Sequence, residues 1–160
     1  MVSLYYSPNS CALASHILLE EVHANYSAIE INFNKNEQKQ SNYLSVNAKG
    51  RVPALLTDEG VLTETPAILL YIAQKYPQKK MAPLHNVYQL AKAQEFNSYL
   101  CSTAHVAHAH LSRGSRWADD PAAIAAMTAK VPETVSECFS FLESGTVSYT
   151  HLRAHETFAN

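Results

Sequence analysis

Residues 2–22, VSLYYSPNSCALASHILLEEV, decide the fold because they combine a strand, a turn and a helix in that order. The run VSLYY favours a β-strand, and the turn residues from Ser7 to Ser10 end it. From Cys11 to about Val22 the apolar residues recur with helical spacing. Cys11 therefore lies where a strand passes into a helix, and its thiol is either reactive or simply buried packing.

The residues that follow extend this start to a predicted βαβαββα domain. SAIEINF (27–33) predicts a strand that alternates through Ile29, Ile31 and Phe33, and a polar loop then leads to a short helical patch from Tyr43 to Val46. The first two strands flank a helix and are expected to be parallel. RVPALLTDEGVLTE (51–64) predicts a hairpin, and TPAILLYIAQKY (65–76) a helix with Thr65 as N-cap and Pro66 at its first position.

The second half of the chain is predicted to be entirely helical. A helix is expected from about Asn86 to Ser112, with a break at RGSRWADD (113–120) and a restart at Pro121 capped by Asp119 or Asp120. Pro132 is expected to kink or split that last helix. We therefore predict an α/β domain (1–77), a linker (78–85) and a partial all-α domain (86–147).

Residues 148–160, SYTHLRAHETFAN, have no amphipathic period and resemble the peptide obtained when a sequencing adapter is translated in frame. We expect this segment to be a non-native tail and exclude it from functional reasoning, as one would an expression scar. On that reading the native protein is longer than the printed sequence.

The composition indicates a soluble globular protein. Apolar residues make up 47% of the chain, and the net charge of −2 removes the electrostatic case for nucleic acid or an anionic membrane as a partner. No export or membrane segment is expected. The three cysteines, an odd number at wide spacing, do not form a disulfide framework and favour a reducing, cytoplasmic setting.

Three local features carry chemistry, each with an ordinary structural alternative. A thiolate at Cys11 is favoured by the helix start, and because Ala14 stands where a second cysteine would be, disulfide chemistry needs an external thiol. Val52-Pro53 opens a strand, and a cis bond there would leave the Val52 backbone free to pair with an extended peptide, whereas a trans proline would merely start the strand. The position three residues after Thr65 is Ile68, so no side-chain carboxylate completes a capping box and the helix end can receive a ligand carboxylate. Glu64 beside it could bind a ligand ammonium. Taken alone, this feature is an ordinary N-cap.

Together these features resemble the glutathione S-transferase family over roughly residues 1–143. YYSPNSCALASH (5–16), NAKGRVPALL (47–56) and NSYLCSTAHVAHAH (97–110) look most like the bacterial beta class, in which a cysteine takes the place of a tyrosine or serine. The resemblance implies a thioredoxin-like domain followed by helices, glutathione as co-substrate, a small hydrophobic electrophile, a detoxifying activity and a homodimer. It also implies an electrophile site between the two domains.

Carried over position by position, the resemblance places Cys11 beside the glutathione sulfur and makes the Val52 backbone the partner of the cysteinyl unit. Glu64 would bind the γ-glutamyl amino group. Thr65, at a position where serine is usual, would bind the γ-glutamyl carboxylate, and Lys35 would bind the glycyl carboxylate. His105 would face the thiol.

The histidines of the second half allow a further interpretation. Cys101, His105 and His108 share one helix face and His110 lies near it, but a metal is disfavoured because these side chains lack a fourth convergent ligand. Hydrogen bonding or proton transfer by His105 is favoured, whereas His108 and His110 are expected to pack. His16, on the first helix, is expected to be structural.

Two chemistries remain open for the thiol. If bound glutathione is the thiolate, the reaction is conjugation to an electrophile; if Cys11 is the thiolate, it forms a mixed disulfide and supports thiol-disulfide exchange or peroxidase activity. A non-catalytic glutathione-binding or hydrophobic-ligand-binding protein is the alternative, and a further one is that the fragment does not fold stably.

Overall fold

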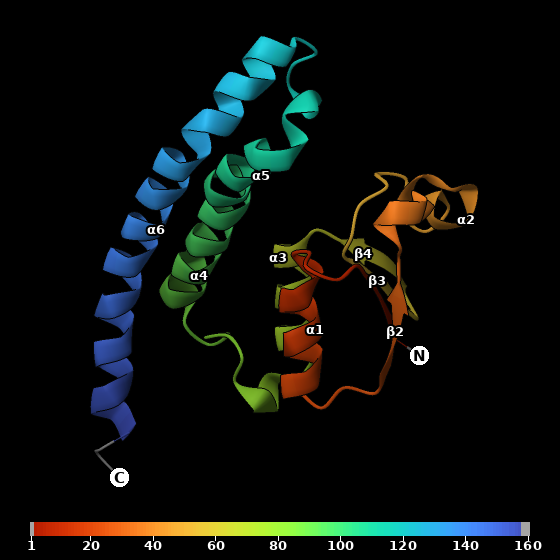
Figure 1. Cartoon of the computed structure of the whole chain (residues 1–160). Coiled ribbons are helices and arrows are strands. Elements are labelled where there is room, and N and C mark those ends of the chain that lie inside the picture. Colours follow the sequence, from red (N-terminus) through yellow and green to blue (C-terminus); the bar gives the residue numbers. More distant parts are fainter. Residues whose placement is uncertain (1, 158–160) are drawn as a thin grey trace. The chain divides into compact units, whose positions relative to one another are not determined.

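The computed structural model describes residues 2–157, with side chains through residue 144, as two compact units, Met1–Gln94 and Glu95–Asn160. The first unit is built on a mixed sheet (Figure 1), and the second is helical. The unit boundary falls within helix α4 (Val87–Tyr99). The domain limits expected from the sequence, 1–77 and 86–147, remain predictions, as does the non-native origin of residues 148–160, of which 158–160 lie outside the described residues.

The sheet of the first unit has the strand order β2-β1-β3-β4. β1 and β2 are parallel with Val2 opposite Tyr26, whereas β3 is antiparallel to β1 and to β4. The parallel pair is the one predicted from the crossover through the first helix. The strands are β1 (Val2–Tyr6), β2 (Tyr26–Glu30), β3 (Ala54–Thr57) and β4 (Gly60–Thr63).

Two buried clusters hold this unit together. Leu4 and Leu55 of the sheet pack with residues of α1 (Ala12–Glu21) and α3 (Thr65–Lys75), and the Leu4, Leu55 and Ile68 side chains are fully buried. The second cluster joins Ala12, Ile31, Tyr43 and Val52 beside the short helices that follow β2. Those helices are η1 (Phe33–Lys35), η2 (Glu37–Lys39) and α2 (Ser41–Leu44), and η3 (Pro77–Lys79) follows α3.

Two boundaries in this unit differ from the prediction. β2 ends at Glu30, so Phe33 belongs to η1 and the Ile29 side chain is 37% exposed, because β2 is an edge strand with little packed on its outer face. α3 begins at Thr65 with Glu64 as its N-cap, one residue earlier than predicted, and no side chain caps that end. Glu64 rather than Thr65 is therefore the residue that turns the chain into the helix.

In the second unit a π-helix interrupts the long helix predicted from Asn86 to Ser112. η4 (Leu100–Ala104) separates α4 from α5 (His105–Arg113), and the His105 N–H donates to the Leu100 carbonyl, five residues earlier. η5 (Gly114–Arg116) and a loop lead to α6 (Pro121–Thr157), where Asp120 Oδ1 accepts from the Ala122 N–H at 3.0 Å. Asp120, one of the two predicted residues, is the cap.

Of the two effects expected of Pro132, a kink or a split, the split does not occur, since α6 runs through this residue. A proline removes one hydrogen bond of the helical ladder, and packing against α5 offsets that loss. The Thr128 hydroxyl donates to the His110 carbonyl at 3.4 Å, and Val131 and Cys138 are buried. Nearby, the Tyr99 and Phe141 rings lie 4.5 Å apart.

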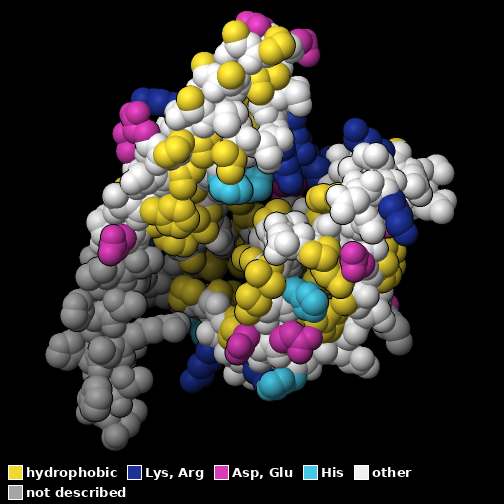
Figure 2. Space-filling model, viewed as in Figure 1, with side chains coloured by type: hydrophobic (Ala, Val, Ile, Leu, Met, Phe, Trp, Pro, Cys, Tyr) yellow, Lys and Arg dark blue, Asp and Glu magenta, His cyan; other side chains and the backbone are white. Residues whose placement is uncertain are grey.

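Apolar side chains are also exposed. Figure 2 shows hydrophobic atoms on the surface of both units, and in the second unit Trp117, Phe139 and Phe141 are about half exposed or more. Among residues 2–157, no helix combines the length and the apolar character needed to cross a membrane.

Candidate functional site

Cys11 is held at the start of α1 by a compact turn. It is the N-cap residue, and its thiol is exposed. Asn9 turns the chain with φ of 56°, and the Ser10 hydroxyl donates to the Ser7 carbonyl at 2.6 Å and accepts from the Ala12 N–H at 3.3 Å. One backbone N–H at the start of α1 is therefore bonded within the turn, while the positive end of the helix dipole still points toward Cys11.

The Cys11 thiol lies against the segment that opens β3. Its S–H donates to the Val52 carbonyl with an Sγ to O distance of 3.6 Å. The Val52-Pro53 peptide bond is cis, so of the two alternatives considered from the sequence, a cis or a trans proline, the structure has the cis form. The structure thus brings together two of the predicted site residues, which are 41 positions apart in the chain.

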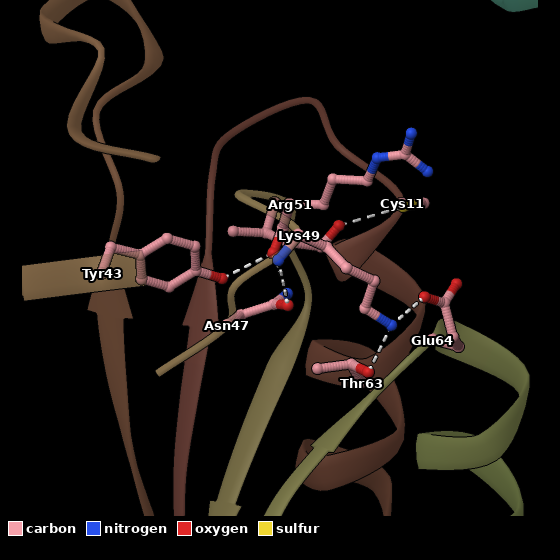
Figure 3. Close-up of polar contacts among 8 residues, drawn as sticks. Cys11, Tyr43, Asn47, Lys49, Arg51, Thr63 and Glu64 are labelled. Atoms are coloured by element: carbon pink, nitrogen blue, oxygen red, sulfur yellow. Dashed lines mark hydrogen bonds and ion pairs between the residues drawn. The ribbon is translucent and has the colours of Figure 1, made fainter. Parts of the chain in front are cut away.

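The loop before Val52 is fixed by two residues that sequence reasoning missed. The buried Tyr43 hydroxyl donates to the Arg51 carbonyl at 2.6 Å, and the buried Asn47 Nδ2 donates to the same oxygen at 2.7 Å (Figure 3). Asn47 Oδ1 in turn accepts from the Lys49 N–H at 3.1 Å. Burial raises the pKa of the Tyr43 phenol to about 12, so it remains a donor at neutral pH.

Gly50 allows this loop to approach the preceding one. Its φ is +59°, and a Cβ at this position would lie 2.8 Å from the backbone oxygen of Gln38. Only glycine fits both the conformation and the contact. The loop that carries Lys35 and the loop that ends at Val52 are therefore in direct backbone contact.

Lys35 lies on the first of these loops with its side chain exposed. Its N–H donates to Asn32 Oδ1 at 3.2 Å, and its carbonyl accepts from Gln40 Nε2 at 3.3 Å. The backbone of Lys35 is therefore fixed, whereas its assignment to a ligand carboxylate stays a prediction.

Glu64 stands at the junction of β4 and α3 in an unusual conformation. Its φ is 70° and its ψ is 120°, a region that costs about 1–3 kcal/mol for a residue with a side chain. Its Oε1 lies 2.5 Å from Lys49 Nζ, which also donates to Thr63 Oγ1 at 2.7 Å (Figure 3). Lys49 is a further residue that the sequence analysis missed.

Thr65 follows as the first residue of α3. The carboxylate of Glu64 and the first N–H groups of α3 are thus adjacent along the chain. This arrangement suits a ligand that carries an ammonium and a carboxylate close together.

The histidine positions fall in both units. His16 of α1 has ring contacts with Tyr6 at 5.3 Å and Tyr26 at 5.8 Å, which supports its predicted structural role. His105 is the first residue of α5, and its role at the thiol stays a prediction. The His110 ring packs edge-on against Trp117 at 4.5 Å. Within the described part of the chain, no group of three or more His, Cys, Asp or Glu side chains has the arrangement of a metal site.

The first unit therefore gathers a thiol, a backbone segment at a cis proline, and an acidic residue beside a helix start. A thiol next to an extended backbone segment at a cis proline can act on the sulfur of a peptide that pairs with that segment. Cys11 and Val52 are in contact, and Glu64 is tied through Lys49 to the loop that ends at Val52.

Comparison with known proteins gives a consistent result. The family model for the N-terminal domain of glutathione S-transferases matches residues 1–74. Glutathione S-transferase GstA of Escherichia coli O157:H7 is 36% identical over 107 residues, which make up 65% of this chain and 53% of that protein. The chain thus spans about half the length of this curated relative.

Two solved structures extend the likeness to the helical unit. A glutathione transferase homolog from Sulfitobacter, solved with bound glutathione, is 41% identical with a TM-score of 0.86 and covers 90% of this chain and 69% of its own. A bacterial beta class glutathione S-transferase from Sphingomonas chungbukensis is 32% identical with a TM-score of 0.75, and the match covers 89% of this chain and 69% of that protein. The predicted thioredoxin-like unit followed by helices is confirmed.

Proposed function

This chain belongs to the glutathione S-transferase family, and from that premise we propose that it binds glutathione and conjugates its sulfur to small hydrophobic electrophiles. The observation that carries the proposal is the 3.6 Å contact between Cys11 Sγ and the Val52 carbonyl. It sets a thiol beside the backbone that would pair with the cysteinyl unit of the tripeptide.

The proposed binding mode uses the residues of the first unit. The Val52 backbone pairs with the cysteinyl unit, Glu64 binds the γ-glutamyl ammonium, and Thr65 with the start of α3 receives the γ-glutamyl carboxylate. Lys35 binds the glycyl carboxylate. Its exposed side chain and fixed backbone suit a charge that contacts a ligand at the solvent edge.

In the proposed reaction, the ionised glutathione sulfur attacks an electrophilic carbon. A C–S bond forms, and the leaving group departs with the electron pair of the bond that breaks. Cys11 can donate its S–H hydrogen bond to the glutathione thiolate once that sulfur lies beside it. His105 is proposed to receive or share the thiol proton.

Cys11 also suits a second, redox activity. Its thiol is exposed, so its thiolate can attack a glutathione disulfide and release one glutathione. It can also attack an organic hydroperoxide and become a sulfenic acid, with release of the alcohol. Glutathione then condenses with the sulfenic acid to give a mixed disulfide and water. A second glutathione restores the Cys11 thiol and leaves as oxidised glutathione.

The same family membership supports a proposal on the assembly and setting of the protein. We propose that it forms a homodimer and acts in the cytoplasm in detoxification, with 1–77 and 86–147 as its functional domains. Size-exclusion chromatography at micromolar concentration tests the dimer, and elution as a monomer only would contradict it.

The decisive experiment measures glutathione conjugation of an aryl halide with the wild-type chain, with Cys11→Ala and with Cys101→Ser. Cys101 is the comparison, because it is another exposed cysteine and none of the proposed glutathione contacts uses it. We expect turnover in the wild type and in Cys101→Ser. Calorimetry measures glutathione binding in parallel, and disulfide exchange and peroxide reduction are assayed with the same variants.

The outcomes separate the alternatives. Conjugation retained in Cys11→Ala makes glutathione itself the nucleophile, whereas loss of disulfide exchange and peroxide reduction in that variant assigns the redox activity to Cys11. Binding without turnover would indicate a non-catalytic glutathione-binding protein. No binding by the wild type would refute the proposal.

A further inference from the structure

The contact between Lys49 and Glu64 joins two parts of the candidate site that the sequence separates. Lys49 belongs to the loop that ends at Val52, and Glu64 precedes α3. Lys49 Nζ contacts Glu64 Oε1 at 2.5 Å and Thr63 Oγ1 at 2.7 Å. This lysine has no role in the proposed chemistry, yet its ammonium contacts Glu64, the residue that is proposed to bind the ammonium of the ligand.

We propose that Lys49 is a positioning residue for glutathione binding, which holds the Glu64 carboxylate so that its second oxygen can receive the γ-glutamyl ammonium. The inference rests on the proposed function, and it adds a residue that acts through Glu64 without taking part in the chemistry. Lys49 is fixed from its own side too, because its N–H donates to the buried Asn47 side chain.

The chemistry of a carboxylate permits this arrangement. A carboxylate offers two oxygens and about four lone-pair directions, so it can accept from Lys49 and from a ligand at the same time. Without Lys49, the Glu64 side chain, which is 64% exposed, would rotate freely and lose that freedom on binding. Lys49 therefore lowers the entropic cost of binding the ammonium.

The charges of the ligand oppose the reverse interpretation, in which Lys49 only competes with the ammonium. The γ-glutamyl end carries an ammonium and a carboxylate on one carbon atom. Repulsion between Lys49 and the ammonium is therefore offset by attraction between Lys49 and the carboxylate. The Lys49–Glu64 pair has no net charge, and the γ-glutamyl end that it receives has none either.

The test compares Lys49→Met, Lys49→Arg, Glu64→Gln and the double variant Lys49→Met/Glu64→Gln by glutathione calorimetry and conjugation kinetics. Lys130→Met is the matched control, because it removes an exposed Lys–Glu pair of similar exposure in the other unit. From the usual strength of exposed ion pairs, we expect Lys49→Met to raise the Kd and KM for glutathione about two- to fivefold with kcat unchanged.

Further results follow if Lys49 acts through Glu64. Lys49→Arg restores affinity to within about twofold, Lys130→Met leaves it unchanged, and Lys49→Met has no added effect in the Glu64→Gln background. Since Lys49 is about half exposed, the variant is expected to fold, and far-ultraviolet circular dichroism checks this.

Three results would overturn the inference. They are tighter glutathione binding in Lys49→Met, full additivity with Glu64→Gln, and a fall in kcat with KM unchanged. If the variant loses its fold, Lys49 is a stability residue and the inference also fails. A wild-type chain that does not bind glutathione refutes the proposed function itself, and that result is distinguishable because it appears before any variant is compared.

Discussion

Substitution of Gly50 by alanine tests whether close approach of two loops builds the candidate site. At φ of +59°, a residue with a Cβ costs about 1–2 kcal/mol relative to glycine. The new Cβ would also lie 2.8 Å from the Gln38 backbone oxygen. That atom cannot rotate away as a side chain could, and overlap of this kind costs about 1–3 kcal/mol.

The two terms together predict that Gly50→Ala lowers the free energy of unfolding by about 2–5 kcal/mol. Urea unfolding followed by circular dichroism measures this loss. Asn36→Ala is the matched control, because Asn36 has a similar φ of 53° and already carries a Cβ, so that only the backbone preference changes. We expect the control to lose about 1 kcal/mol or less.

Glutathione binding provides the second readout. The loop that must shift carries Lys49 and ends at Val52, so calorimetry should show weaker binding in Gly50→Ala than in Asn36→Ala. A loss of stability equal in the two variants, with equal affinity for glutathione, would refute the reasoning from the Gln38 contact.

Three other outcomes are expected. Tyr43→Phe removes one of two donors to the Arg51 carbonyl and should cost about 0.5–1.5 kcal/mol in urea unfolding. Because burial raises the folded-state pKa of Tyr43 to about 12, the contribution of this phenol to stability is present below pH 10 and is lost between pH 10 and 12. The stability of the wild type should therefore fall more over this range than that of Tyr43→Phe. Asn47→Ala removes one of the two donors to the Arg51 carbonyl and the acceptor of the Lys49 N–H, so it should lower stability by about 1–3 kcal/mol and weaken glutathione binding. Unchanged affinity would contradict the role given to this loop. Asp120→Ala should lower the thermal unfolding midpoint of the helical unit, at a cost of about 1 kcal/mol, whereas Asp119→Ala should not, and equal effects would contradict the assignment of the cap.

Local signals predicted most of the first unit. Alternation, helical spacing and turn residues are properties of neighbouring positions, and they located the strand, turn and helix around Cys11 as well as the hairpin before α3. The Asp120 cap is similarly a contact within one turn of helix. The family resemblance, confirmed by the comparisons, depended on the order of these local motifs.

Features that depend on contacts distant in sequence were missed. The hydroxyl of Tyr43 and the ammonium of Lys49 meet partners 8 and 15 positions away, and no spacing rule announces such pairs. Pro132 was expected to kink or split α6, since its helical penalty is local, whereas the packing of α6 on α5 that offsets this penalty in the unsplit helix is tertiary. The predicted end of β2 was wrong for the same reason, because the length of an edge strand depends on what covers it.

The π-helix η4 has a consequence for how residues of this chain should be matched to those of its relatives. A π-helical turn corresponds to one extra residue within an α-helix. Because the wider π-turn accommodates that residue locally, deletion of one residue from Leu100–Ala104 with return to a regular α-helix would leave the faces presented by the following residues nearly unchanged. In a relative without the π-turn, the residue that corresponds in space to His105 is therefore found only when a one-residue gap is placed within Leu100–Ala104.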